Sequence, residues 1–145
     1  MTKIALIIIL AGLAPLRESY AATPKEDYEL QERCGKRTDE LFKREYGTSG
    51  VINTKDGQAL VGYRNHYNKK LNKCFFLLTY SDLPYKNKKT AASTQISLYD
   101  ISENREYGSY FIRVVDKLPI HCKVLDKLCR SEQEWNSLVN PYMEE

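Results

Sequence analysis

The sequence predicts a single α+β domain in which two helices pack on an antiparallel sheet of four or five strands. Three observations lead to this prediction. Segments with helical periodicity stand near both ends of the mature chain, and the segments between them alternate apolar and polar residues as strands do. Four cysteines can cross-link the domain. We expect both helices to pack on the same face of the sheet.

The first 21 residues have the order of a secretory signal peptide. Lys3 gives a short positive start, residues 4–14 are apolar and uncharged, and small residues precede a cut after Ala21. The apolar run is too short to cross a hydrocarbon layer of about 30 Å as a helix. The prediction is therefore a signal peptide at 1–21 and one exported domain at 22–145. That domain would lie in the periplasm or outside the cell, with no transmembrane segment in the mature chain.

The charge of the chain is nearly balanced. It carries 22 Lys and Arg against 19 Asp and Glu, a formal net charge of +3. A nucleic-acid-binding protein usually needs a strong positive surplus, so neither this balance nor export favours nucleic acid as a partner.

The mature chain has an even number of cysteines, and in an exported protein this predicts two disulfides. Four cysteines allow three connectivities. We favour Cys34–Cys74, which would tie the first helix to a strand, and Cys122–Cys129, which closes a short loop. The alternative is a zinc site, but zinc ligands usually come in closer pairs such as C-x₂₋₄-C. The calcium-loop pattern is also absent. No metal and no other cofactor are expected.

The first helix is expected to begin after Thr23 and to run to about Tyr46. Thr23 can cap it, Pro24 suits the first helical position, and Glu26 completes a capping box. Gly47 then provides a C-terminal stop.

The middle of the chain predicts two hairpins. Strands are expected at 51–54, 59–67, 74–80, 95–101 and 106–115. The apolar run at 74–78 is typical of a central strand that is covered on both faces. The polar stretch at 81–93 is expected to be a surface loop.

The last third combines a cysteine-closed segment with a helix. Residues 119–130 are expected to form a loop or an irregular strand. Ser131 can cap the helix that follows, with Glu134 completing a second capping box. Its apolar face would consist of Trp135, Leu138, Val139 and Tyr142. We expect Pro141 to end or kink this helix early.

The most distinctive segment is residues 63–75, YRNHYNKKLNKCF, which could form a polar patch at a strand end. The candidate binding residues are Tyr63, His66, Tyr67, Asn68, Lys69 and Lys70. Together with Leu98-Tyr99-Asp100 and Cys129-Arg130-Ser131, this segment resembles a group of small exported bacterial proteins of unassigned function. The resemblance spans most of the mature chain and implies a bacterial, extracytoplasmic setting in which all four cysteines are retained. It implies no activity, so it assigns no site residue.

His66 has two interpretations. Imidazole titrates near pH 6.5, so His66 could serve a small hydrolase together with a carboxylate such as Asp100 or Glu106. No local motif supplies a nucleophile for that chemistry. The favoured interpretation is structural, with Asn and His side chains satisfying turn and cross-strand hydrogen bonds.

A basic surface is a further possibility. It would combine Lys69, Lys70, Lys73, Lys86, Lys88 and Lys89 with Tyr67, Tyr80 and Tyr85. Such a surface can hold phosphates or meet anionic lipid or polysaccharide. Solvated loop lysines are the simpler interpretation and the one we favour.

The sequence thus predicts a non-enzymatic binding protein, periplasmic or secreted, whose partner is another protein or an anionic envelope component. The 11 tyrosines support this, because tyrosine combines an apolar body with a polar tip and suits contact surfaces. Two alternatives stay open: the small hydrolase that uses His66, and a purely structural component of the envelope.

Overall fold

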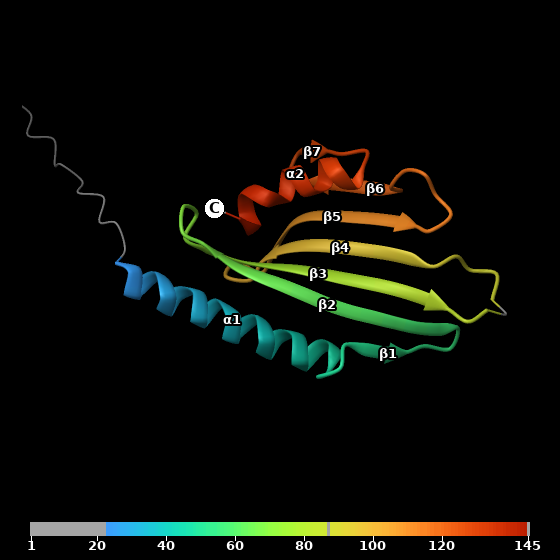
Figure 1. Ribbon diagram of the computed structural model, residues 1–145, viewed down its shortest axis with the longest axis horizontal. Coiled ribbons are helices and arrows are strands. Elements are labelled where there is room, and N and C mark those ends of the chain that lie inside the picture. Colours follow the sequence, from blue (N-terminus) through green and yellow to red (C-terminus); the bar gives the residue numbers. More distant parts are fainter. Residues whose placement is uncertain (1–22, 87, 145) are drawn as a thin grey trace, which may run out of the picture.

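The computed structural model describes residues 23–86 and 88–144. The predicted signal peptide, residues 1–21, lies outside the described residues. In chain order the elements are α1 (Pro24–Tyr46), β1 (Val51–Asn53), β2 (Gly57–Asn68), β3 (Lys73–Pro84), β4 (Ser93–Asp100), β5 (Arg105–Arg113), β6 (His121–Val124), β7 (Lys127–Leu128) and α2 (Glu132–Met143). Figure 1 shows α1 along the β1–β2 side of the sheet and α2 on the β5–β7 side.

Local signals in the sequence set both ends of α1. Thr23 and Glu26 form the predicted capping box, in which the Thr23 side chain accepts from Glu26 N and the Glu26 carboxylate accepts from Thr23 N. Gly47 follows the last turn with φ 72°, a backbone conformation that favours glycine. The predicted bounds of this helix are confirmed.

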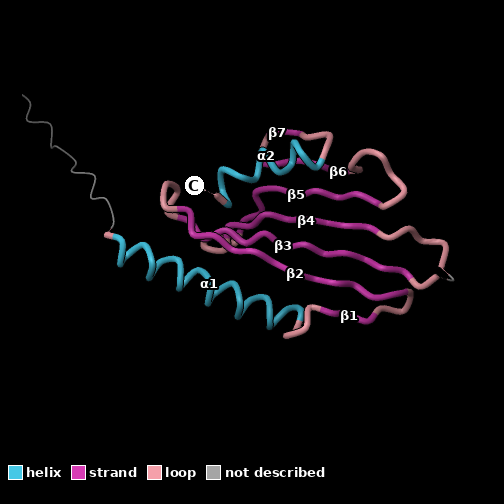
Figure 2. Tube along the Cα trace, viewed as in Figure 1, coloured by secondary structure: helices cyan, strands magenta, loops and turns pink. Residues whose placement is uncertain are grey.

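The sheet is an antiparallel meander in which each strand pairs with the next, in the order β1 to β7 (Figure 2). It has 7 strands rather than the predicted four or five. Both additional strands come from the segment 119–130, where β6 and β7 form a short hairpin closed by the Cys122–Cys129 disulfide. The bond holds these short strands together, which strand periodicity alone could not reveal.

β3 is longer than predicted, because it continues through Ser81 to Pro84 into the stretch expected to be a loop. Ser81 and Asp82 pair with β2 on one side and β4 on the other. Pairing on both sides places these polar residues in the sheet despite their weak strand propensity.

The helices pack on opposite faces of the sheet, so the expectation of a single shared face is wrong. Phe75 and Leu77 of β3 belong to one buried cluster with α2, whereas Cys74 and Phe76 belong to another with α1. Successive residues of a strand point to opposite faces. The apolar run of this central strand is therefore covered on both sides, as its composition predicted.

α2 continues past Pro141 to Met143, contrary to the expected early end. Pro141 lies in the last turn, where its missing N–H removes a single helical hydrogen bond. At the other end, Ser131 caps the helix by accepting from Glu134 N at 3.1 Å. The Glu134 carboxylate accepts from Arg130 N at 2.8 Å, one residue before the position that a capping box requires.

Candidate functional site

The sheet divides the binding patch predicted at residues 63–70 into two parts. In the β2–β3 register Tyr63 and Tyr67 lie opposite Leu78 and Cys74, which place them on the α1 face. His66 and Asn68 alternate with them and therefore lie on the α2 face. Lys69 and Lys70 lie in the turn that follows β2. These residues do not share one surface.

Tyr63 is part of the packing between α1 and the sheet. Its ring lies 4.6 Å from that of Phe42 and 5.3 Å from that of Phe76, measured between centroids. Its hydroxyl donates to Asp39 Oδ1 at 3.3 Å. Burial, together with the neighbouring Asp39 carboxylate, raises the pKa of Tyr63. These contacts give the side chain a structural role.

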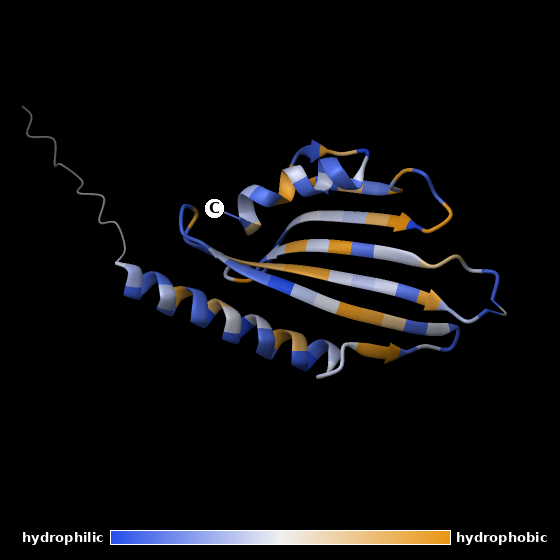
Figure 3. Ribbon diagram, viewed as in Figure 1, coloured by the Kyte–Doolittle hydropathy of each residue, from blue (hydrophilic) through white to orange (hydrophobic). Residues whose placement is uncertain are grey.

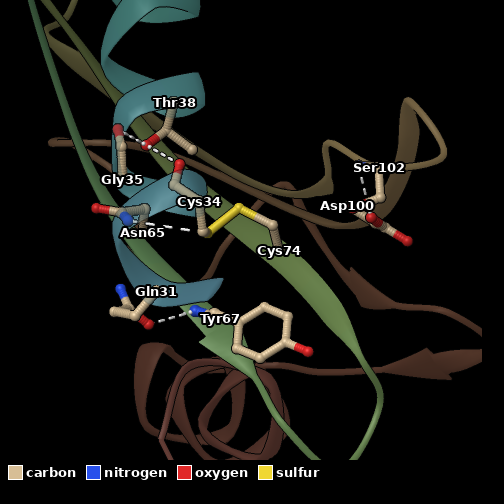
Figure 4. Close-up of a disulfide and its surroundings, with 9 residues drawn as sticks. All are labelled: Gln31, Cys34, Gly35, Thr38, Asn65, Tyr67, Cys74, Asp100 and Ser102. Carbon is tan, nitrogen blue, oxygen red and sulfur yellow. Dashed lines mark hydrogen bonds between the residues drawn. A yellow bond between two sulfur atoms is a disulfide. The ribbon is translucent and has the colours of Figure 1, made fainter. Parts of the chain in front are cut away.

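Tyr67 is held beside the Cys34–Cys74 disulfide (Figure 4). Its backbone N–H donates to Oε1 of Gln31 on α1 at 2.8 Å, and its hydroxyl donates to Asn72 Oδ1 at 2.6 Å. The helix side chain thus satisfies a backbone donor of β2, and the disulfide fixes the same turn of the helix to β3.

Asn68 connects the β2–β3 hairpin to the end of α2. It is 1% exposed, and its Nδ2 donates to the carbonyl oxygen of Pro141 at 2.9 Å. Its Oδ1 accepts from Leu71 N in the hairpin turn at 3.0 Å. The side chain thus joins segments more than 70 positions apart in the sequence.

Replacing Asn68 with Ala is expected to lower the free energy of unfolding by about 2 kcal/mol, because buried partners on both sides lose a hydrogen bond. Urea denaturation measures the loss. Asn136→Ala is the matched control, since Asn136 is exposed on α2 and should change stability by no more than about 0.5 kcal/mol. Equal losses in the two variants would contradict this role for Asn68.

The carboxylates considered for a hydrolase do not lie beside His66. Asp100 shares its face, but Phe75 stands between them in the register. Asp100 is fully buried and accepts from Lys73 Nζ at 2.6 Å and from Ser102 N at 2.8 Å. Hydrogen bonds from Lys73 to Asp100 and Glu103 raise the pKa of its ammonium group. Glu106, opposite Tyr99 across the β4–β5 pairing, belongs to the other face.

The lysines of the proposed basic surface form two groups at opposite ends of β3. This strand has 12 residues and spans roughly 36 Å at about 3.3 Å per residue. Lys69 and Lys73 lie near its start, and the lysines that follow Tyr85 lie beyond its end. The six residues therefore do not make one surface.

A groove that the sequence does not predict lies between α1 and the sheet. We call it the α1 groove. It has a volume of about 620 Å³ and is lined by Arg37, Glu40, Leu41, Arg44, Glu45, Tyr46, Phe76, Leu78, Tyr99, Asp100, Ile101 and Asn104. The floor comes from β3 and β4, because α1 covers mainly β2 and leaves this part of the sheet open. The groove depends on which strands the helix leaves uncovered, and this is a property of the tertiary structure.

Two tyrosines line the α1 groove, Tyr46 at the end of α1 and Tyr99 on β4. Tyr80 of β3 does not line it but packs against the same apolar cluster. Burial raises the pKa of the Tyr46 hydroxyl, and the nearby Tyr99, Glu45 and Tyr80 raise it further. The groove therefore offers flat apolar surfaces together with hydroxyl groups.

Two arginines stand on the helical wall of the groove. Arg37, Leu41 and Arg44 are spaced by four and three residues and share one side of α1. Arg44 Nε lies 2.8 Å from Glu45 Oε1. Arg37 is exposed and makes no ion pair with any residue in 23–86 or 88–144. An anionic group in the groove could therefore pair with its guanidinium.

The disulfides, the potential metal ligands and the helices of the described residues bear on the compartment of the protein and on the kinds of site it can hold. The two disulfides have the pairing favoured from the sequence, and they fit an oxidising, extracytoplasmic compartment. Within residues 23–86 and 88–144, no three His, Cys, Asp or Glu side chains gather as a metal site would require. None of the helices there has the length and apolar character needed to span a membrane.

Comparisons with protein-family models, curated proteins and solved structures found no match to this chain.

Proposed function

We propose that this chain is an exported, non-enzymatic binding protein that holds a short segment of a partner protein in the α1 groove. The observation that carries the proposal is the combination of an aromatic and aliphatic floor with an arginine that has no ion-pair partner among the described residues. Tyrosine and arginine are among the residues enriched at energetically important positions of protein contacts.

The chemistry of the groove specifies its ligand. Phe76, Leu78 and Tyr99 favour an aromatic or aliphatic side chain, and Arg37 favours a carboxylate next to it. The volume lies within the range of about 300–1,000 Å³ that is common for ligand sites and suits a few residues of a peptide. The expected ligand is therefore an acidic segment with one large apolar side chain.

Selection of a displayed random peptide library on the mature chain tests the proposal. Enriched peptides should place Asp or Glu beside an aromatic or aliphatic residue and should bind saturably when labelled and titrated. Arg37→Glu should weaken this binding about tenfold or more, because it replaces an attractive charge with a repulsive one.

Arg33→Glu is the matched control, since Arg33 is exposed on the same helix but does not line the α1 groove. This variant should bind the selected peptides as tightly as the native chain. The proposal fails if no selected peptide binds saturably, or if the two arginine variants weaken binding equally.

A further inference from the structure

The meander brings three loops together at one end of the sheet: β1–β2, β3–β4 and β5–β6 (Figures 1 and 2). Backbone hydrogen bonds connect them. Tyr85 N donates to Asp56 O at 2.8 Å, and Val114 N donates to Ala92 O at 2.8 Å. This end of the molecule is separate from the α1 groove.

The β5–β6 loop exposes a group of aliphatic side chains. Val114 is 76% exposed, Val115 70%, Leu118 64% and Ile120 54%. Figure 3 shows hydrophobic colour in this loop, which leaves the sheet as a projecting arc. Single exposed apolar residues are common on protein surfaces, but a contiguous group of this kind marks an interaction site.

The valines occupy the centre of a well-held turn. Asp116 N donates to Arg113 O at 2.9 Å, which makes Val114 and Val115 its two central residues. The Arg113 guanidinium donates to both carboxylate oxygens of Asp116, at 2.8 and 3.0 Å. Turn centres usually carry Gly, Pro, Asn or Asp. Here the ion pair and the backbone bonds hold two β-branched apolar side chains out in solvent.

Positive charge surrounds the apolar loop. Lys88 pairs with Asp56 at 2.8 Å, and Arg113 pairs with Asp116. Four further lysines at this end are exposed and make no ion pair with any described residue. They are Lys55, Lys86, Lys89 and Lys117. The carboxylate of Asp82, near the end of β3, is a further acidic group close to the described residues of these loops. The net charge of this end of the molecule is therefore positive.

We propose that this loop end is a docking surface for an anionic lipid membrane, with Val114 and Val115 entering the headgroup region and the four lysines facing lipid phosphates. The shape favours lipid over a protein partner. The apolar side chains project from a convex turn, and a fluid bilayer surface accepts such a projection without a matching cavity. Binding to such a surface combines the burial of apolar side chains with the electrostatic attraction of basic residues to anionic headgroups.

Vesicle co-sedimentation of the mature chain tests this. Vesicles of equal parts phosphatidylglycerol and phosphatidylcholine should bind the protein, and pure phosphatidylcholine vesicles or high salt should weaken binding strongly because the attraction is electrostatic. The paired change Val114→Asp and Val115→Asp should weaken binding to the anionic vesicles about tenfold or more, since it removes apolar contact and adds repulsion. The double variant Lys86→Glu, Lys89→Glu should also bind the anionic vesicles more weakly than the native chain, because it replaces positive with negative charge.

Leu128→Asp is the control, because Leu128 is 78% exposed on β7, outside the three loops, and this variant should bind like the native chain. Circular dichroism would check that every variant is folded. The proposal is overturned if anionic vesicles bind no more protein than neutral ones, or if the valine variant binds them as well as the native chain does. It is also overturned if the loop end binds a purified protein partner and no vesicle. All these outcomes are independent of peptide binding in the α1 groove.

Discussion

Replacing both Cys34 and Cys74 with Ala is expected to lower the free energy of unfolding by about 4 kcal/mol. The bond joins positions separated by 40 residues, and opening such a loop gives the unfolded chain many more conformations. It also fixes α1 to the central strand β3 inside a buried cluster, with Cys34 and Cys74 themselves buried. A loss of this size is a large part of the roughly 5–15 kcal/mol that stabilises a typical domain.

Urea denaturation followed by circular dichroism measures this effect. The Cys122→Ala, Cys129→Ala pair is the comparison, because that bond spans only 7 positions and should contribute about 2.5 kcal/mol. Equal losses, or a larger loss from the short loop, would contradict the larger contribution expected of the longer bond. Loss of the α1 groove should accompany loss of the longer bond, since the helix forms one wall of that groove.

Trp135 packs on the opposite face of the sheet, and Trp135→Ala is expected to lower the free energy of unfolding by about 4 kcal/mol. Trp135 is fully buried and anchors α2, with its ring 5.8 Å from that of Tyr110. Gly108 allows this packing: a Cβ there would lie 3.2 Å from Trp135 Cζ3 and 2.8 Å from Lys123 O. Truncating the indole leaves a cavity that a rigid sheet cannot close.

Thermal and urea unfolding followed by far-UV circular dichroism measures the loss for Trp135→Ala, because the chain contains 1 Trp and its fluorescence disappears in the variant. Leu128→Ala provides the exposed comparison and should change stability by no more than about 0.5 kcal/mol. A variant as stable as the native chain would mean that α2 does not depend on this side chain for docking.

The alternation of side chains along a strand explains why the predicted binding patch is divided. Tyr63 and Tyr67 are separated by an even number of positions, and His66 and Asn68 alternate with them. In a strand this spacing places the two pairs on opposite faces. The unusual composition of the segment predicts one polar surface, and that prediction ignores the alternation of the strand. The contacts explain the composition differently: Tyr63 packs against α1, and Asn68 links the hairpin to α2.

The α1 groove could not be predicted in the same way. Its arginines and Leu41 follow helical spacing, and Leu78 and Tyr99 lie on strands whose existence was predicted. Neither pattern predicts that this side of the helix borders an uncovered part of those two strands. The lysines are a second example, because the group at 69–73 and the group at 86–89 lie at opposite ends of β3 and do not form one surface.

The sequence by itself determined the features that depend on a few neighbouring residues. These include the capping of α1 by Thr23 and Glu26, its end at Gly47, the alternation of the strands and the apolar face of α2. The tertiary structure alone decided that the helices cover opposite faces, that β3 continues to Pro84 and that a groove remains beside α1. The physical reason is range: caps and turns act within about one helical turn or one hairpin, whereas the face that a helix covers depends on packing between distant segments.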